Sequence, residues 1–440
     1  MKKLVLIIIA VLLAGTAAWF LLHGSKDAAR DILPADATTV AVLEPVELMR
    51  GLGLKPDKAS KLVLNLKDFA EGIDLTKPVY AFASESGLTG IALSVKDEEA
   101  LLKAFSGISY ASEEQQGYQW IANRSSIGCM DKDKLLLIAP AAETQQDALR
   151  AGMMRLMRQS RQDVPALDQA NKQKGFLRVS AAVDGAGTVG AGLSIGERDI
   201  TLSTEATELA PAVKGAAEVL SPSGGLLPTI GKEPPFAWLY MNVNGEKLLP
   251  VLRSNPQIRD VLTGLNVGVF DADLFLKAIS GDVMVAVPSL NLLHPEVYGA
   301  VCVTSTDFLA NADEWTGVTR IGEKDYLFSG DDVQLFFRDC GGSLFFATTR
   351  ELFDSYLREG NGPGLQANAA GRYLSGSVDV GGILRGNPSV AILLAAMPSL
   401  AEAVGAIGEF KVSASGPQSL ELSLTTNKPV REIITSIFPQ

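Results

Sequence analysis

Short runs of alternating apolar and polar residues follow one another along most of the chain, and segments with apolar positions three or four residues apart separate them. The first pattern is typical of half-buried strands and the second of amphipathic helices. In the first half, strands are predicted at Lys77–Ala83 and Gly90–Val95, and a helix at Glu98–Phe105. Further strands at 117–122, 134–139, 175–182 and 200–204 and a helix at 144–158 are also expected.

The same order of patterns returns in the second half. Strands are predicted at Gly281–Pro288 and Tyr298–Val303, followed by a helix at Asp307–Trp315. The later counterparts are strands at 324–328, 343–348, 371–378 and 420–425 and a helix at 350–358. Such self-similarity is typical of a duplicated unit. We therefore predict two α+β repeats, residues 32–221 and 236–440, joined near the Pro- and Gly-rich segment Pro222–Pro235. Short turns and alternating strands favour mainly antiparallel sheets with helices packed on one face.

An uncharged apolar segment at the N-terminus predicts a membrane anchor over residues 1–24. Leu4–Leu22 contains 19 residues, which at about 1.5 Å per residue nearly span a hydrocarbon core of ~30 Å. Lys2 and Lys3 precede the segment, so the positive-inside rule places the body outside the cytoplasm, in the periplasm or at the cell surface. Secretion after cleavage at the small residues Gly15–Ala18 is the alternative, but the apolar run continues past them through Trp19–Leu22.

Charge argues against nucleic acid as a partner. The chain has 39 basic and 50 acidic residues, a formal net charge of −11, whereas binding to phosphates needs a basic face. Arginines do recur at Arg150, Arg155, Arg158 and Arg161, but their spacing is that of one solvated helix face.

The three cysteines have no metal-binding spacing and no disulfide framework. Cys302 lies in an apolar run and is expected to be buried. A Cys302–Cys340 disulfide can form only if the strands that carry these cysteines are neighbours. We therefore expect all three cysteines, Cys129 included, to be free thiols.

The sequence identifies no catalytic, cofactor-binding or metal-binding residue. The only histidines are His23, beside the anchor, and His294, in a loop, which excludes a Ser-His-Asp triad or a histidine-rich zinc site built from them. Gly185, Gly187 and Gly190 match the dinucleotide-binding glycine pattern, but strands rather than a helix are expected after them, which favours a hairpin.

Acidic pairs and tryptophans are further candidates for binding. Asp131 with Asp133, Asp271 with Asp273, and Asp331 with Asp332 lie at predicted turns or helix starts, where aspartate is locally favoured. None has the spacing of a calcium loop, so a metal site or a carboxylate pair would have to be assembled across the fold. Trp120, Trp238 and Trp315 are expected in the core.

Four segments carry a resemblance that covers essentially the whole body: Leu33–Thr38, Gly72–Tyr80, Gly117–Ile121 and Asp131–Leu137. With them the chain resembles an uncharacterised family of Bacteroidales cell-envelope proteins, domain of unknown function 4836. The resemblance implies an envelope location but transfers no catalytic residue. Many members resemble lipoproteins with a cysteine after the signal, and this chain has none there.

These patterns favour a non-enzymatic envelope protein that acts as a binding or scaffold module. We expect it to meet the membrane through its N-terminal helix and to bind an envelope protein or a small ligand, without a cofactor. The alternative is a hydrolase that uses carboxylates or a serine in a cleft between the repeats. A sensor is a weaker third interpretation, because only Met1–Lys3 would remain in the cytoplasm.

Overall fold

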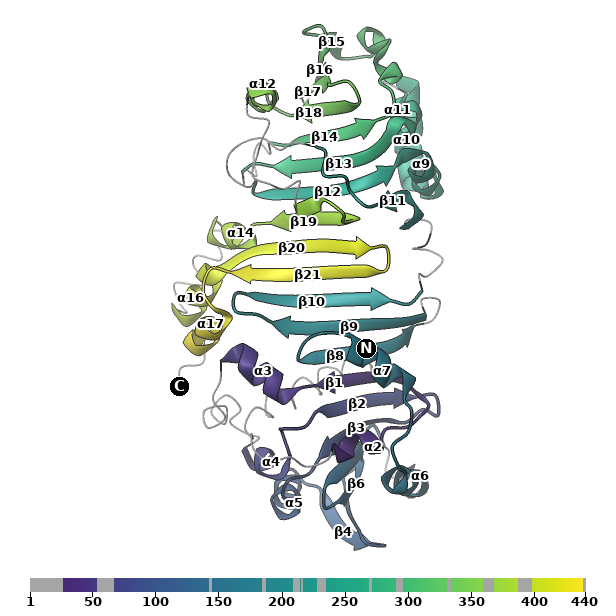
Figure 1. The fold of residues 1–440 in the computed structure, drawn as a ribbon, viewed down its shortest axis with the longest axis vertical. Coiled ribbons are helices and arrows are strands. Elements are labelled where there is room, and N and C mark those ends of the chain that lie inside the picture. The colour runs from purple at the N-terminus through teal and green to yellow at the C-terminus, as the bar shows by residue number, and fades with distance from the viewer. Residues whose placement is uncertain are drawn as a thin grey trace. The chain divides into compact units, whose positions relative to one another are not determined.

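A computed structural model gives the fold shown in Figure 1. The structure describes residues 27–53, 67–141, 145–183, 187–208, 214, 217–227, 235–268, 271–289, 296–330, 334–358, 368–386 and 398–437. The chain divides into two compact units. The first contains residues 1–208, 398–406 and 426–440, and the second contains residues 209–397 and 407–425.

The first unit is an antiparallel sheet with short helices. Its strands are β1 (Ala37–Leu43), β2 (Val79–Ser84), β3 (Thr89–Ser94), β4 (Ala111–Gln115), β5 (Tyr118–Ala122), β6 (Ile127–Asp131), β7 (Lys134–Ile138), β8 (Leu177–Val183), β9 (Gly187–Ile195) and β10 (Asp199–Ala206). Its helices are α2 (Ala28–Asp31), α3 (Pro45–Leu52), α4 (Lys67–Gly72), α5 (Glu98–Gly107), α6 (Gln146–Arg158), α7 (Pro165–Lys172), α16 (Pro398–Ala406) and α17 (Val430–Ile437). Hydrogen bonds join the strands in the order β10-β9-β8-β1-β2-β3-β7-β6-β5-β4.

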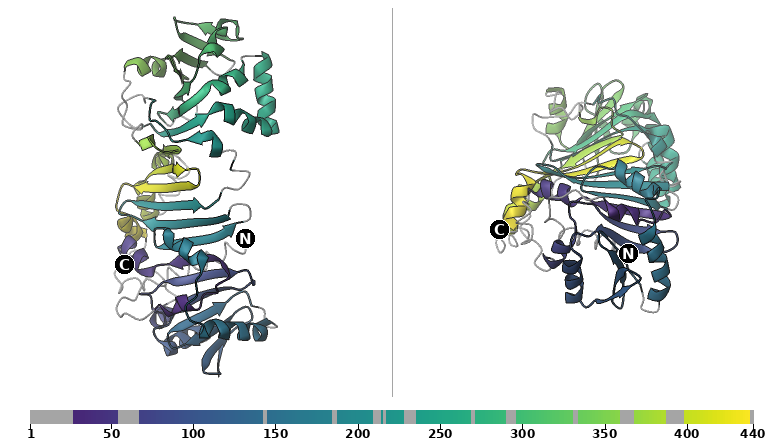
Figure 2. Two further views of the ribbon diagram at one scale, coloured as in Figure 1. Left: turned by 45° about the vertical axis from the view of Figure 1, so that its right-hand side comes forward. Right: turned by 60° about the horizontal axis from the view of Figure 1, so that its bottom comes forward.

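Helices cover both faces of this sheet. Successive residues of β1 contribute to different cores: Val40 and Val42 pack with α2, α6 and α7, whereas Ala41 and Leu43 pack with α4 and α5. Figures 1 and 2 show α4 and α5 on one side of the sheet and α6 on the other. The prediction of helices on one face is therefore wrong. The central strands are buried on both faces, as their nearly continuous apolar sequences require.

The second unit has the same kind of sheet. Its strands are β11 (Leu220–Ser221), β12 (Ala237–Asn244), β13 (Ile279–Val287), β14 (Tyr298–Val303), β15 (Val318–Arg320), β16 (Asp325–Ser329), β17 (Gln334–Asp339), β18 (Ser343–Ala347), β19 (Leu374–Val378), β20 (Ile407–Gly416) and β21 (Ser419–Thr426). Its helices are α9 (Gly245–Ser254), α10 (Pro256–Gly268), α11 (Ala272–Ala278), α12 (Arg350–Arg358) and α14 (Val380–Gly386), with 3-10 turns η3 (Asp307–Leu309) and η4 (Ala312–Glu314).

Strand order in the second unit follows that of the first. Hydrogen bonds join β20-β19-β12-β13-β14-β18-β17-β16-β15, and β21 lies beside β20. Two cores again cover opposite faces: Val243 and Val301 pack with α9 and α11, and Tyr240 and Ala300 pack with Phe353 of α12. The protein is thus α+β with antiparallel pairing in each unit, as the sequence predicts, but with helices on two faces.

One predicted helix of the second unit does not form. The segment Asp307–Trp315 makes the two 3-10 turns η3 and η4 instead of an α-helix. Asn311 lies between them with φ −113° and ψ 28°, which are not helical values. Asp and Asn side chains compete with the backbone for hydrogen bonds, which disfavours a continuous helix here. Phe308 and Leu309 are nevertheless buried in the core.

The C-terminal helices α16 and α17 belong to the first compact unit. Helix α17 contacts α16 and α3, and its first residue, Val430, is 2% exposed. The Val430 N–H donates to Glu197 O in the β9–β10 turn. These contacts bring Arg431 of α17 to the site described below.

The predicted membrane anchor, residues 1–24, lies outside the described residues. Within the part of the chain that the structure does describe, no helix combines the length and the apolar character that crossing a membrane requires.

Candidate functional site

The acidic pairs have local structural roles where the structure describes them. Asp131 Oδ1 accepts the Lys132 N–H at 2.7 Å in the β6–β7 turn. Asp271 caps α11 by accepting the Leu274 N–H at 2.8 Å, and Asp273 pairs with Arg253. Over the described ranges, no cluster of three or more His, Cys, Asp or Glu side chains is arranged to hold a metal ion. Asp331, Asp332, His23 and His294 lie outside those ranges.

The glycine pattern belongs to a hairpin, as predicted. Gly187 opens β9, which pairs antiparallel with β8, and has φ +63°; β9 continues as a strand through Gly190 to Ile195. Gly185 lies outside the described residues. Because no helix follows the glycines, the helix N-terminus that binds a pyrophosphate is missing at this place.

All three cysteines are free thiols, as expected. Cys129 is buried, and burial raises the pKa of its thiol to about 12. Cys302 is half-buried and faces Ser343 of β18, whereas Cys340 is exposed after β17. The prediction that Cys302 is fully buried is therefore too strong.

The arginines predicted on one helix face do lie on or just after α6, and two of them contact aromatic rings. The Arg150 guanidinium is 4.7 Å from the Trp120 ring centroid and pairs with Glu113 at 2.5 Å. Arg158 lies over Tyr118 at 5.9 Å. Trp120 is buried in the core as predicted, and Trp238 and Trp315 are half-buried against the cores of the second unit.

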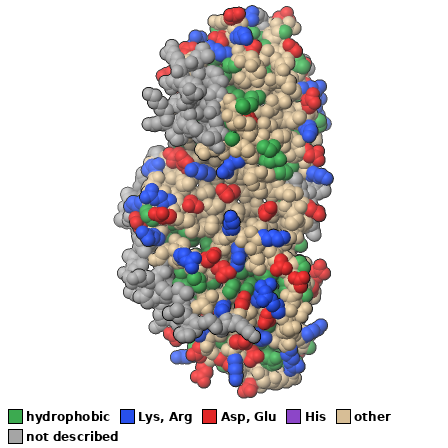
Figure 3. Space-filling view, viewed as in Figure 1, with side chains coloured by type: hydrophobic (Ala, Val, Ile, Leu, Met, Phe, Trp, Pro, Cys, Tyr) green, Lys and Arg blue, Asp and Glu red, His purple; other side chains and the backbone are tan. Residues whose placement is uncertain are grey.

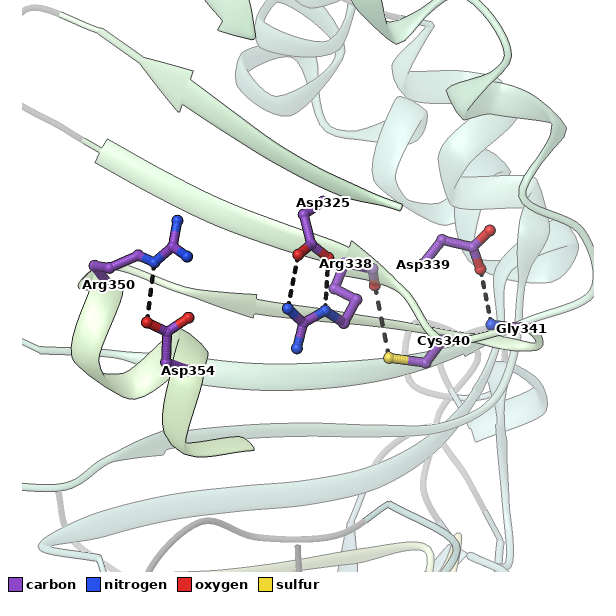
Figure 4. Close-up of polar contacts among 7 residues, drawn as sticks. All are labelled: Asp325, Arg338, Asp339, Cys340, Gly341, Arg350 and Asp354. Carbon is purple, nitrogen blue, oxygen red and sulfur yellow. Dashed lines mark hydrogen bonds and ion pairs between the residues drawn. The ribbon is translucent and has the colours of Figure 1, made fainter. Parts of the chain in front are cut away.

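A second arginine-rich cluster lies in the second unit and is drawn in Figure 4. Arg338 donates two hydrogen bonds to Asp325, at 2.6 and 2.7 Å, across the β16–β17 pair. Its guanidinium also lies 4.3 Å from the Phe353 ring centroid. Arg350 of α12 bonds Asp354 at 3.0 Å. Arg338 pairs with Asp325 and lies over the ring of Phe353, so the cluster joins α12 to the sheet.

Asp282 forms a buried polar cluster in the second unit. Its carboxylate is fully buried and accepts hydrogen bonds from Gly224 N, Leu226 N, Tyr240 Oη and Asn242 Nδ2, at 2.8 to 3.1 Å. Burial alone would raise the pKa of Asp282, but these hydrogen bonds, with one from Ser223, hold it below its usual value. The cluster ties the segment before β12 to the sheet, and burial closes it to ligands.

The candidate site is a pocket of about 440 Å³ in the first unit, within the range of about 300 to 1,000 Å³ that is typical of small-molecule sites. It is lined by side chains and backbone of α3, the residues before β8, the β9–β10 turn and α17. These residues are Glu47, Arg50, Gly51, Gly175, Phe176, Ser194, Ile195, Gly196, Glu197 and Arg431.

Glycines allow close packing beside the pocket, where α3 meets the sheet. Gly175 has φ +115°, and a Cβ there would lie 2.2 Å from Leu193 O, so no side chain fits. Gly53 ends α3 with φ +62°, and a Cβ there would lie 3.0 Å from the Arg431 side chain. A left-handed residue after a helix is typically glycine. The turn after α3 therefore lets the aliphatic part of Arg431 pack directly on the backbone.

Charges of both signs line this pocket. Glu47, Arg50 and Glu197 are exposed. Their side chains make no ion pair or hydrogen bond with any residue that the structure describes. Glu47 and Arg50 lie on the same face of α3. On the face of the molecule seen in Figure 3, basic and acidic side chains are likewise interspersed.

The pocket has no evident catalytic arrangement. The Ser194 hydroxyl points to Thr201 O at 3.5 Å and makes no bond to Glu47 or Glu197 among the described residues. A serine nucleophile needs a base within hydrogen-bonding distance. The geometry of this pocket therefore favours binding over acyl transfer. The predicted hydrolytic cleft between the repeats stays a prediction.

Sequence reasoning missed this pocket because its residues come from distant parts of the chain. Arg50 and Arg431 lie near opposite ends, and the glycines resemble those of ordinary turns. One feature of the sequence does point to the pocket: Gly51 and Gly53 follow the charged residues Glu47 and Arg50 on α3. Two glycines at the end of a helix leave its backbone exposed.

Comparisons with known proteins leave the family open. No family model matches the chain, and no curated protein matches it. Among solved structures, crystal form III of TP0453 is similar at 12% identity, covering 48% of this chain and 90% of that chain with a TM-score of 0.31. Form IV gives 15% identity, 44% and 85% coverage and a TM-score of 0.29. Form I gives 14% identity, 40% and 77% coverage and a TM-score of 0.28. Similarity at this level supports no functional inference.

Proposed function

We propose that the protein is a non-enzymatic binding protein of the cell envelope. The observation that carries the proposal is the pocket of the first unit, which has the volume of a small-molecule site. Three of its charged side chains, Glu47, Arg50 and Glu197, have no partner among the described residues. Charged side chains of this kind are hydrated in the free protein, and a polar ligand can replace the water by bonding to them. No nucleophile and base are paired in this pocket.

Location is the second part of the proposal. The apolar segment Leu4–Leu22 after Lys2 and Lys3 supports an anchor that holds the body outside the cytoplasm. We also propose that the two units are copies of one module. The matching strand orders support this interpretation, as do the parallel sequence patterns in the predicted repeats. Membership of the envelope family that the sequence resembles remains part of the proposal.

The binding function is tested by ligand retention. The full-length protein is purified in detergent, incubated with an extract of cell-envelope small molecules, washed and examined by native mass spectrometry. We expect one class of small molecule to be retained with unchanged mass. Turnover of the retained molecule would contradict the non-enzymatic assignment, and an empty protein would contradict small-molecule binding.

Location is tested separately. Protease added to cells with a permeabilised outer layer should digest the body while the cytoplasmic membrane is intact. N-terminal mass analysis of the remaining fragment should find Met1 and the uncleaved segment. A protected body would contradict the extracytoplasmic location, and a new N-terminus near Gly15–Ala18 would show signal cleavage.

A further inference from the structure

The positive side of the pocket in the first unit is formed by two arginines from different helices. Arg50 lies in the last turn of α3 and Arg431 in the first turn of α17. The close approach of the Arg431 side chain to the Gly53 backbone places this arginine at the end of α3. Guanidinium groups are suited to binding carboxylates, because their N–H groups form a planar fork.

The negative side is formed by two glutamates. Glu47 lies one turn before Arg50 on α3, and Glu197 lies in the turn after β9. Neither carboxylate has a hydrogen-bond partner among the described residues, so each can accept bonds from an ammonium group. The four side chains bring two positive and two negative charges to one pocket, which leaves it without net charge.

Apolar surface lies between these charges. Phe176 and Ile195 line the pocket, and Gly51, Gly175 and Gly196 add backbone without side chains. A ligand that fits must carry separated charges of both signs and some apolar surface. A simple anion would pair with Arg50 and leave the two glutamates without a cationic partner among the described residues.

We infer that this pocket binds a small zwitterion with the dimensions of an amino acid or a dipeptide. Its carboxylate lies against Arg50, on the side of the pocket that Arg431 also lines, and its ammonium group lies against Glu47 and Glu197. This inference rests on the proposed binding function and names its ligand class.

The test uses three matched probes with the full-length protein in detergent, measured by isothermal titration calorimetry. The probes are the dipeptide alanylphenylalanine, its N-acetyl derivative without the ammonium group, and its C-terminal amide without the carboxylate. We expect the dipeptide to bind, and each blocked derivative to bind roughly tenfold or more weakly, as expected for loss of a charge-assisted contact.

Variants assign the two ends of the ligand. Arg50→Gln should weaken the dipeptide roughly tenfold but have little effect on the amide, which already lacks the carboxylate. Glu197→Gln should weaken the dipeptide but have little effect on the N-acetyl derivative. Arg155→Gln on α6 and Glu99→Gln on α5 are controls, because both side chains are exposed and lie outside the pocket. Unchanged melting temperatures would show that the variants fold.

The outcomes separate the ligand class from the function. Equal binding of all three probes, or wild-type affinity in both pocket variants, would overturn the zwitterion assignment. If the dipeptide fails to bind while the retention experiment captures another small molecule, the ligand class is wrong and the binding function stands. If neither experiment finds a ligand, both are wrong.

Discussion

Replacing Asp282 by asparagine tests whether the buried carboxylate cluster holds the second unit together. The change keeps the shape of the side chain but puts an NH2 group where one carboxylate oxygen was. One oxygen accepts from Gly224 N and Asn242 Nδ2, and the other from Leu226 N and Tyr240 Oη. Whichever way the new amide turns, at least one backbone N–H faces another donor, whereas the Tyr240 hydroxyl and the Asn242 amide can turn to accept.

The cost follows from the backbone hydrogen bond that an NH2 group cannot accept. A hydrogen bond to a charged group contributes about 1.5 to 3 kcal/mol, so removing one predicts a destabilisation of about 1.5 to 3 kcal/mol. Few single substitutions cost more than about 4 to 5 kcal/mol. Because hydrogen bonds hold the folded pKa of Asp282 below its ordinary value of 3.8, the stabilisation is present above that value and is lost as the pH falls through the folded pKa.

Hydrogen exchange at neutral pH measures the effect locally. In Asp282→Asn, amides of β12 and β13 should lose protection by roughly tenfold or more, while β1 and β2 of the first unit keep theirs. Asp260→Asn is the matched control, because that side chain is 76% exposed on α10. Wild-type protection of β12 and β13 in Asp282→Asn would refute the role given to the cluster.

Three further predictions concern other charged and thiol groups. Burial raises the pKa of Asp27 despite its hydrogen bond from Tyr80, so the folded protein binds a proton at Asp27 more tightly than the unfolded chain does. The stability of the protein should therefore fall as the pH rises through the folded pKa of Asp27. Asp27→Asn should therefore raise the melting temperature at pH 7 and flatten its dependence on pH, and an unchanged profile between pH 4 and 8 would contradict this. Iodoacetamide should label Cys340 before Cys129 in the native protein, as peptide mass spectrometry can show, because Cys340 is exposed and Cys129 is buried. Asp325→Asn should destabilise the protein by about 3 to 5 kcal/mol in urea denaturation, because it leaves Arg338 half-paired beside the Phe353 ring; a change of under about 1 kcal/mol would contradict the interpretation as a buried pair.

The order of elements could be predicted from the sequence because each element has a strong local signal. Helix α5 begins at the predicted Glu98, after Asp97, which caps it by accepting the Ala100 N–H at 3.0 Å. Helix α12 has the predicted bounds Arg350–Arg358. Periodicity and capping are properties of neighbouring residues, so one sequence is enough to find them.

The two-sided packing and the pocket depend on contacts between distant residues, which leave weaker signals in the sequence. The runs Val40–Leu43 and Val79–Ala83 are nearly continuous in apolar residues, which is typical of strands buried on both faces. Interpreting them as alternating strands led to the one-face prediction. For the pocket, no local pattern places Arg431 beside Gly53, because that contact depends on the return of α17 to the first unit.

Tyr80 and Asp282 occupy matching positions in the two units. Each bonds a preceding segment of the chain to its sheet, but Tyr80 does so as a hydrogen-bond donor and Asp282 as an acceptor. Tyr80 pairs with Val42 and Asp282 with Asn242, and each partner lies two residues before the N-cap of the following helix. In the first unit the tyrosine donates to Asp27 in the segment that enters the sheet, at 2.5 Å. In the second unit the carboxylate is on the strand and accepts N–H groups from the entering segment. Since the pKa of Asp27 is raised and that of Asp282 is lowered, acid should loosen the attachment in the second unit and strengthen the one in the first.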